Sequence, residues 1–171
     1  MVLLSQIGLL VIFPLLMAYA AASDLLTMTI PNRISLALLG AFGVLAVVGG
    51  MSLHAVALHA GAGALVLCVM FACFAFGWIG GGDAKLAAAT ALWLGFGPLV
   101  DYMVLAAVAG GVLTAAVLFL RWAPVPVQGF GLPWLTRLQE SKSGVPYGIA
   151  LAAAALIVYP QSEIWTAAFA R

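Results

Sequence analysis

The sequence predicts an all-α, polytopic membrane protein with about six transmembrane helices in a single domain over residues 1–171. The first observation is composition: 66% of the residues are hydrophobic and only 6% are charged, against roughly 25% charged residues in a soluble domain. The second is that the apolar residues form long uncharged runs, which lipid can solvate. The net charge of +1 and the scattered basic residues argue against nucleic-acid binding.

The expected spans follow from the lengths of these runs, since a spanning helix needs roughly 20 mostly apolar residues. The uncharged run 34–82 is too long for one span, and polar and glycine residues at 49–54 divide it into two. The run 86–100 is too short alone, so the fourth span is expected to begin near Gly80. The first run is expected to be retained rather than removed as a signal peptide. The six predicted spans are residues 2–23, 34–48, 55–79, 80–100, 102–120 and 144–161.

The distribution of Lys and Arg predicts the orientation. The links after the second and fourth spans contain no basic residue, and Arg171 is the only one at the C-terminus. Links rich in Lys and Arg face the cytosol, so both termini are expected outside (N-out and C-out), which requires an even number of spans. The links after the first, third and fifth spans hold Arg33, Lys85, Arg121, Arg137 and Lys142.

Three acidic residues lie near the expected spans, and each needs a reason because ionisable groups at membrane depth are costly. Asp24 follows the first span and Asp83 lies at the start of the fourth. Both are therefore expected at the cytosolic face and at similar depth. Asp101 follows the fourth span, on the opposite face, and is expected to be a solvated loop residue.

Both cytosolic aspartates also have ordinary structural interpretations. Asp83 is a favourable N-cap residue, preceded by three glycines that would then be a flexible link. Asp24 would be a solvated residue just past a helix, although a carboxylate there opposes the helix dipole. In a functional interpretation, the glycines at 80–82 allow the backbone of a peptide substrate to approach Asp83 closely.

Two carboxyl groups at one depth suggest acid–base chemistry. In an aspartic hydrolase the two groups share a proton: the charged one deprotonates water and the neutral one donates to the scissile carbonyl. A small proton- or cation-coupled transporter, with Asp83 at a broken helix, explains the same residues. A non-catalytic scaffold also remains open. Two histidines, His54 and His59, are too few for a metal site, so no metal and no cofactor is predicted.

Three segments together resemble the prepilin peptidase family, the type IV leader peptidases, which are aspartic membrane proteases with a GxGD-type motif. Asp24 with the Ile30-Pro31-Asn32 that follows it is similar to the first aspartate segment of the family. The run Gly-Gly-Gly-Asp-Ala-Lys-Leu at 80–86 is similar to the second, and Val-Pro-Tyr-Gly at 145–148 resembles the PYG motif. The resemblance implies that Asp24 and Asp83 are the catalytic pair.

The resemblance also implies the substrate and the location. Prepilin and pseudopilin precursors carry a short basic leader followed by an apolar helix, and the family cuts between them at the cytosolic face of the bacterial inner membrane. The short chain looks most like the members that serve tight-adherence (Flp-type) pili. Longer relatives also methylate the new N-terminus and carry an extra domain, often with CxxC motifs. The sequence has no CxxC, so we expect cleavage without methylation. The expected partners are these precursors and membrane lipid, and Lys85 is expected to stabilise a carboxylate, hold a lipid phosphate or snorkel.

Overall fold

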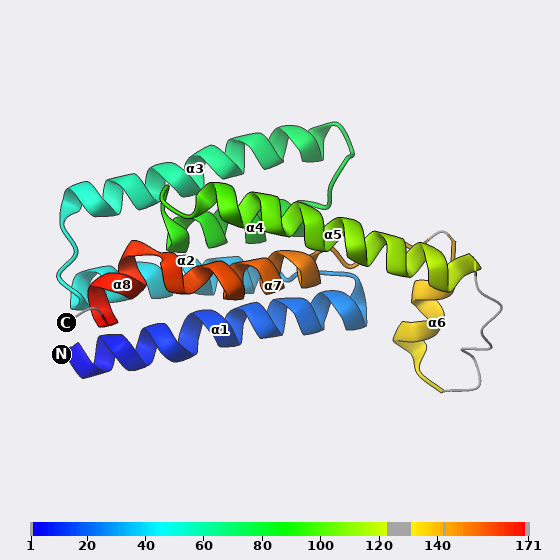
Figure 1. The fold of residues 1–171 in the computed structure, drawn as a ribbon, viewed down its shortest axis with the longest axis horizontal. Coiled ribbons are helices and arrows are strands. Elements are labelled where there is room, and N and C mark those ends of the chain that lie inside the picture. Colours follow the sequence, from blue (N-terminus) through cyan, green and yellow to red (C-terminus); the bar gives the residue numbers. More distant parts are fainter. Residues whose placement is uncertain (1, 123–130, 142, 170–171) are drawn as a thin grey trace.

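The computed structural model describes residues 2–122, 131–141 and 143–169, and all the secondary-structure elements in this part of the chain are helices. The predicted fold class is therefore confirmed as all-α. The helices run mainly along the long axis of an elongated bundle (Figure 1). The elements are α1 (Val2–Thr27), α2 (Asn32–Val48), α3 (Leu53–Ala75), α4 (Gly81–Leu94), α5 (Leu99–Trp122), α6 (Pro133–Gln139), α7 (Gly148–Val158), the 3-10 helix η2 (Tyr159–Gln161) and α8 (Glu163–Phe169).

Fewer helices than predicted are long enough to cross a membrane. Three satisfy length and composition within the described residues: Gln6–Thr27, Leu53–Ala75 and Leu99–Trp122. A fourth span results if Gly148–Gln161 and Glu163–Phe169, which meet at a bend of 46°, are taken together. A helix lies at each of the six predicted positions, but α2 has only 17 residues and α4 only 14. At 1.5 Å per residue, α4 is about 21 Å long, short of a hydrocarbon core of about 30 Å.

The links that were predicted to be cytosolic meet at one end of the bundle. The ends of α1, α3 and α5 and the starts of α2, α4 and α7 lie there, whereas the start of α1 and the end of α8 lie at the other end (Figure 1). Lys142 and Arg171 lie outside the described residues. The basic residues of the described part that belong to this shared end are Arg33, Lys85, Arg121 and Arg137.

Helix α4 is the centre of the bundle. Every residue from Leu86 to Leu94 is buried, and the helix packs on α2, α3 and α7. Alanine occupies many of these positions, so neighbouring helices can approach the α4 backbone closely. The amphipathic pattern of a surface helix is absent because no residue of α4 after Lys85 is more than 8% exposed.

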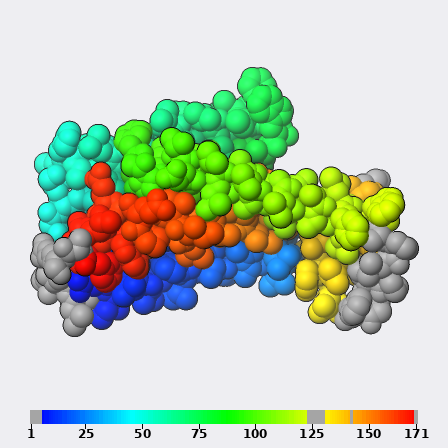
Figure 2. Space-filling model, in the orientation of Figure 1, coloured from blue at the N-terminus to red at the C-terminus, as the bar shows by residue number. Residues whose placement is uncertain are grey.

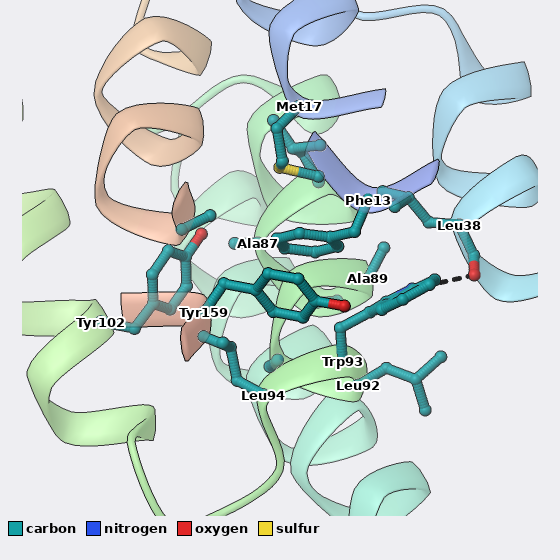
Figure 3. Close-up of a cluster of buried hydrophobic side chains, with 14 of the residues drawn as sticks. Phe13, Met17, Leu38, Ala87, Ala89, Leu92, Trp93, Leu94, Tyr102 and Tyr159 are labelled. Atoms are coloured by element: carbon teal, nitrogen blue, oxygen red, sulfur yellow. Dashed lines mark hydrogen bonds between the residues drawn. The ribbon is translucent and has the colours of Figure 1, made fainter. Parts of the chain in front are cut away.

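Aromatic side chains pack against the second half of α4. The ring centroids of Phe13 and Trp93 lie 5.1 Å apart, and Phe13 stacks on Tyr159 at 4.2 Å. Two polar groups of this cluster donate to backbone carbonyls: the Trp93 indole N–H to Leu38 O at 3.0 Å, and the Tyr159 hydroxyl to Leu9 O at 3.3 Å. Figure 3 shows these side chains converging from α1, α2, α4 and η2. The cluster therefore joins the N-terminal and C-terminal parts of the chain around one helix.

His59 is a buried residue of α3 and caps the end of α4. Its Nδ1 lies 2.8 Å from Leu92 O, and because a carbonyl only accepts, Nδ1 is the donor. The ring packs beside Gly95, which has φ of 73° and ends the helix. A Cβ at Gly95 would lie 3.0 Å from the imidazole, so the turn needs glycine for both conformation and space.

The outer surface of the bundle is apolar. Figure 2 shows α5, α7 and α1 side by side on one face, with α3 along an edge. Large apolar side chains on α5 point outward, with Val104 and Val108 each 58% exposed and Val112 65% exposed. Such a surface would be unstable in water over this area, but lipid solvates it. The chain is a multi-pass membrane protein on this evidence.

Candidate active site

Asp24 lies inside α1, not after its end as the sequence predicted. The helix continues to Thr27, and the Asp24 side chain is only 6% exposed. Met28 then adopts a left-handed conformation with φ of 55°, and its N–H donates to Asp24 O at 2.8 Å. This conformation closes the helix as a C-terminal αL turn but costs a non-glycine residue roughly 1–2 kcal/mol. The turn sends the following residues back across the buried carboxyl group.

The start of α7 supplies the hydrogen-bond partner of Asp24. The backbone N–H of Gly148 donates to Asp24 Oδ2 at 2.7 Å, in a buried bond between residues far apart in the sequence. The first N–H groups of a helix have no partner within the helix and favour negative charge. A Cβ at Gly148 would lie 2.8 Å from Asp24 Oδ2 and 2.8 Å from the Ile30 side chain. Only glycine therefore allows this contact.

Tyr147 is held by a notch in α5 that sequence reasoning missed. A Cβ placed on Gly110 would lie 2.0 Å from the Tyr147 ring and hydroxyl. The ring thus lies against the bare backbone of α5, and it fixes the residue immediately before the Gly148 N–H. The pair Gly110-Gly111 inside an apolar run was the available signal, because glycine in a helix interior costs about 1 kcal/mol and needs a packing reason.

Asp83 is the third residue of α4, and Gly80 is the N-cap. The interpretation of Asp83 as the N-cap is therefore wrong. Its carboxyl group instead accepts a hydrogen bond from the Gly80 backbone N–H, which is half of a capping box. Asp83 is partly buried and lies close enough to Asp24 for the two carboxyl groups to interact electrostatically. The structure thus brings together the two aspartates that the sequence singled out.

Ile30 connects the two aspartate segments. A Cβ at Gly82 would lie 3.1 Å from the Ile30 side chain, which also contacts the Gly148 position beside Asp24. Phe74 lies equally close to Gly81, at 3.2 Å. The glycines at 80–82 therefore make room for this chain's own side chains, and the space beside Gly81 and Gly82 that was expected for a substrate backbone is filled. The glycines do allow close approach, as predicted, but the groups that approach are side chains of this chain and not a substrate backbone.

Helix α6, which follows α5 in the chain, lies at the same end of the bundle (Figure 1). Arg121 donates to Leu138 O at 2.9 Å and to Ser143 O at 2.6 Å. Arg137 donates to Leu26 O at 2.8 Å, two residues after Asp24. These arginines satisfy carbonyl groups that no helix pairs, so α6 is tied to the end of α1 next to the aspartates. From the sequence, these basic residues indicated only the orientation of the chain in the membrane, and not these hydrogen bonds.

Asp101 lies at the opposite end of the bundle from the other two aspartates, as predicted (Figure 1). It is exposed, but it belongs to the first turn of α5 and not to a loop. A carboxylate is favourable at a helix N-terminus, so a structural role is sufficient. Among the described residues, no group of three or more His, Cys, Asp or Glu side chains lies together in a way that could hold a metal ion.

Fold and site together define a helical multi-pass membrane protein with two partly or fully buried aspartates at one end of its bundle. The model of the type IV leader peptidase family matches residues 11–115. The chain belongs to this family, and the resemblance seen in the sequence is confirmed. Comparisons with curated proteins and with solved structures gave no match.

Family membership favours the peptidase over the transporter and the scaffold, because the family consists of aspartic prepilin peptidases. The matched residues contain both Asp24 and Asp83. Residues 145–148, which hold Asp24 through Gly148, lie outside the match. The structure is therefore the independent evidence that this third segment belongs to the site.

The Gly110 notch predicts a sharp difference between two adjacent substitutions. Gly110→Ala should lower the free energy of unfolding by about 1–3 kcal/mol, because the new methyl group overlaps the Tyr147 ring. Gly111→Ala is the matched control, since nothing lies within 4 Å of its Cβ position, and it should be neutral or stabilising by up to about 1 kcal/mol. Thermal unfolding in detergent measures both.

A second background separates the contact from a general effect of alanine in α5. In a Tyr147→Leu variant the ring is absent, so Gly110→Ala should cost little more. An equal loss of stability with and without the ring would show that the Gly110–Tyr147 contact is not what the glycine provides.

Proposed function

We propose that this protein is the aspartic endopeptidase that removes the basic leader from Flp-type prepilins, with Asp24 and Asp83 as its catalytic pair. The observation that supports the proposal is the placement of these two carboxyl groups, one from α1 and one from α4, at the same end of the bundle, where Ile30 packs against both Gly82 and the Gly148 position that holds Asp24. Family membership supplies the reaction class and the prepilin substrate. The choice of Flp-type precursors rests on the resemblance of the short chain to that group.

The proposed mechanism uses one shared proton. The ionised carboxyl group takes a proton from a water molecule, whose oxygen attacks the scissile carbonyl carbon. The protonated carboxyl group donates to the carbonyl oxygen in the same step. Collapse of the tetrahedral intermediate breaks the C–N bond, and the leaving amine receives a proton. Because the two groups titrate as a unit, neither role is assigned to one residue.

The surroundings support this chemistry for Asp24 and Asp83. Gly148 N–H and Gly80 N–H hold the two carboxyl groups by one backbone hydrogen bond each. Such bonds orient the oxygens while each carboxyl group keeps a further oxygen for water or substrate. Backbone donors at the starts of α7 and α4 are also rigid, which limits the reorganisation needed during the reaction.

Asparagine substitutions test the catalytic pair. Asp24→Asn and Asp83→Asn should each reduce cleavage of a co-expressed Flp-type prepilin by at least about a thousandfold, and the double variant should be no worse than either single one. Asp101→Asn, at the opposite end of the bundle, should stay within about twofold of the natural protein. A gel shift of the precursor measures cleavage, and immunoblotting of membranes controls for protein level. Substantial activity in either single variant would remove the paired mechanism.

We also propose that the chain has six membrane-crossing segments, with both termini outside and the aspartates at the cytosolic face. The clustering of Arg33, Lys85, Arg121 and Arg137 at one end of the bundle supports this orientation. Reporter fusions after Arg33, Lys85 and Arg137 should all give a cytosolic signal. A fusion after Gly50 should give the opposite signal, and a periplasmic signal from any of the first three would refute the arrangement.

The proposed activity is cleavage without methylation. The support is the sequence, which has no CxxC pair, and the link 121–143, which is shorter than the roughly 40 residues below which independent domains need staples. Mature pilin made with this enzyme alone should carry a free N-terminal amine by mass spectrometry. A mass increase of one methyl group that depends on S-adenosylmethionine would contradict the proposal.

A further inference from the structure

A lateral groove lies between α2 and α3, with α4 as its floor. Its cavity is about 540 Å³. Leu36 and Leu39 of α2 and Leu67 of α3 line it and are 67%, 56% and 44% exposed, so the groove opens on the apolar outer surface of the bundle. A space of this kind within the membrane region is accessible to lipid and to a partner helix.

The walls of the groove repeat with the period of an α-helix. The lining residues of each helix follow the spacing i, i+3, i+4, i+7. On α2 these are Asn32, Ser35, Leu36 and Leu39, and on α3 they are Ala60, Gly63, Ala64 and Leu67. Residues at these spacings share one face of a helix, so three helical faces surround one slot about two turns, or roughly 10 Å, long. The residues of the α4 floor are Lys85, Ala88, Ala89 and Leu92.

The size of the slot fits a helix seated partly in lipid. Two turns of a helix about 10 Å across, side chains included, fill about 800 Å³. A groove of about 540 Å³ would therefore enclose most of the volume of such a segment. Alanines at 60, 64, 88 and 89 line the slot. Small side chains let the backbones of helices approach closely in a membrane.

The form of the groove points to the kind of occupant. Three helical faces with the same residue spacing, four of whose lining residues are alanines, offer close backbone approach over two turns of an occupying helix. An acyl chain has no matching period. The groove therefore favours a helix over a lipid tail.

The groove begins beside the candidate active site. Lys85 Nζ donates to Asn32 Oδ1 at 2.9 Å across the end of the groove. Lys85 is two residues after Asp83, and Asn32 is two residues after Ile30, which contacts the Gly82 and Gly148 positions. Both aspartate-containing motifs therefore contribute to the site and to the end of the groove. A helix lying in the groove would have its end close to the two carboxyl groups.

We propose that the α2–α3 groove binds the apolar helix that follows the leader in a prepilin, and so places the cleavage point at the start of α4. This inference rests on the proposed function and adds where the substrate docks. The precursor enters sideways from the lipid, its helix lies along α4, and its leader passes the start of α4 toward Asp24 and Asp83. Lys85 and Asn32 are then docking residues at the groove end and not part of the catalytic pair.

Photocrosslinking tests occupancy directly. A photoreactive amino acid replaces Leu39 in the groove or, as a control of equal exposure, Val104 on the outer face of α5 (56% and 58% exposed). Both are made in the Asp83→Asn background with a full-length Flp-type prepilin. A crosslink to the precursor from position 39, at least tenfold stronger than from position 104, is expected. Equal yields from both positions, or an adduct of phospholipid mass alone at position 39, would overturn the docking site.

Filling the groove tests its contribution to cleavage. Ala64→Leu adds bulk at an exposed position of the groove, and Ala107→Leu adds the same bulk at an exposed position of α5. The readout is the ratio of kcat/KM for the full precursor to kcat/KM for a short peptide that has the cleavage sequence but no apolar helix. Ala64→Leu should lower this ratio at least tenfold, and Ala107→Leu should leave it unchanged.

These outcomes separate the two proposals. If the natural protein cuts both substrates while Ala64→Leu leaves the ratio unchanged, the groove is not the docking site but the peptidase assignment stands. If the natural protein cuts neither substrate, the proposed function itself fails, and the docking site fails with it.

Discussion

The burial of α4, every residue of which from Leu86 to Leu94 is buried, is the constraint on which the rest of the structure depends. A helix enclosed by neighbours must have small side chains where backbones approach and satisfied polar groups at both ends. Alanines meet the first need, and His59 meets the second at the C-terminal end by donating to Leu92 O. At the N-terminal end, Asp83 accepts from Gly80 N–H. The residue that is proposed to be catalytic is therefore also part of how the central helix begins.

The candidate site is assembled from segments that no local rule brings together. The helix that contains Asp24 ends in a left-handed turn at Met28. After this turn, Ile30 packs against Gly82, next to Asp83. Gly148 arrives from the last third of the chain and donates to Asp24. The contacts at Gly82 and Gly148 are possible only because glycine has no Cβ, so these glycines are needed for close packing and not for flexibility. Residues under strain at such a place are consistent with function.

Asp83 of the proposed catalytic pair and the floor of the proposed docking groove lie on different faces of α4. Asp83 and Thr90 share a face, and Thr90 donates to Met17 Sδ of α1 at 3.8 Å. Lys85 and the alanines after it face α2 and α3. A substrate bound on one face and cut near the other must cross the start of α4. The central helix can serve both because its length and burial keep the two faces in fixed relation.

Composition, apolar runs and three short motifs were enough to predict a helical membrane protein, its family and the pair Asp24 and Asp83, because these depend on local residue chemistry and order. Helices lie at the six positions expected from the sequence, but α6 and α8 were not predicted, and α4 ends at Leu94 before Gly95 instead of reaching residue 100. Only the tertiary structure placed Gly148 N–H on Asp24, Tyr147 against Gly110 and His59 under the end of α4. Those contacts join residues distant in the chain, and no periodicity or spacing encodes which helix faces meet.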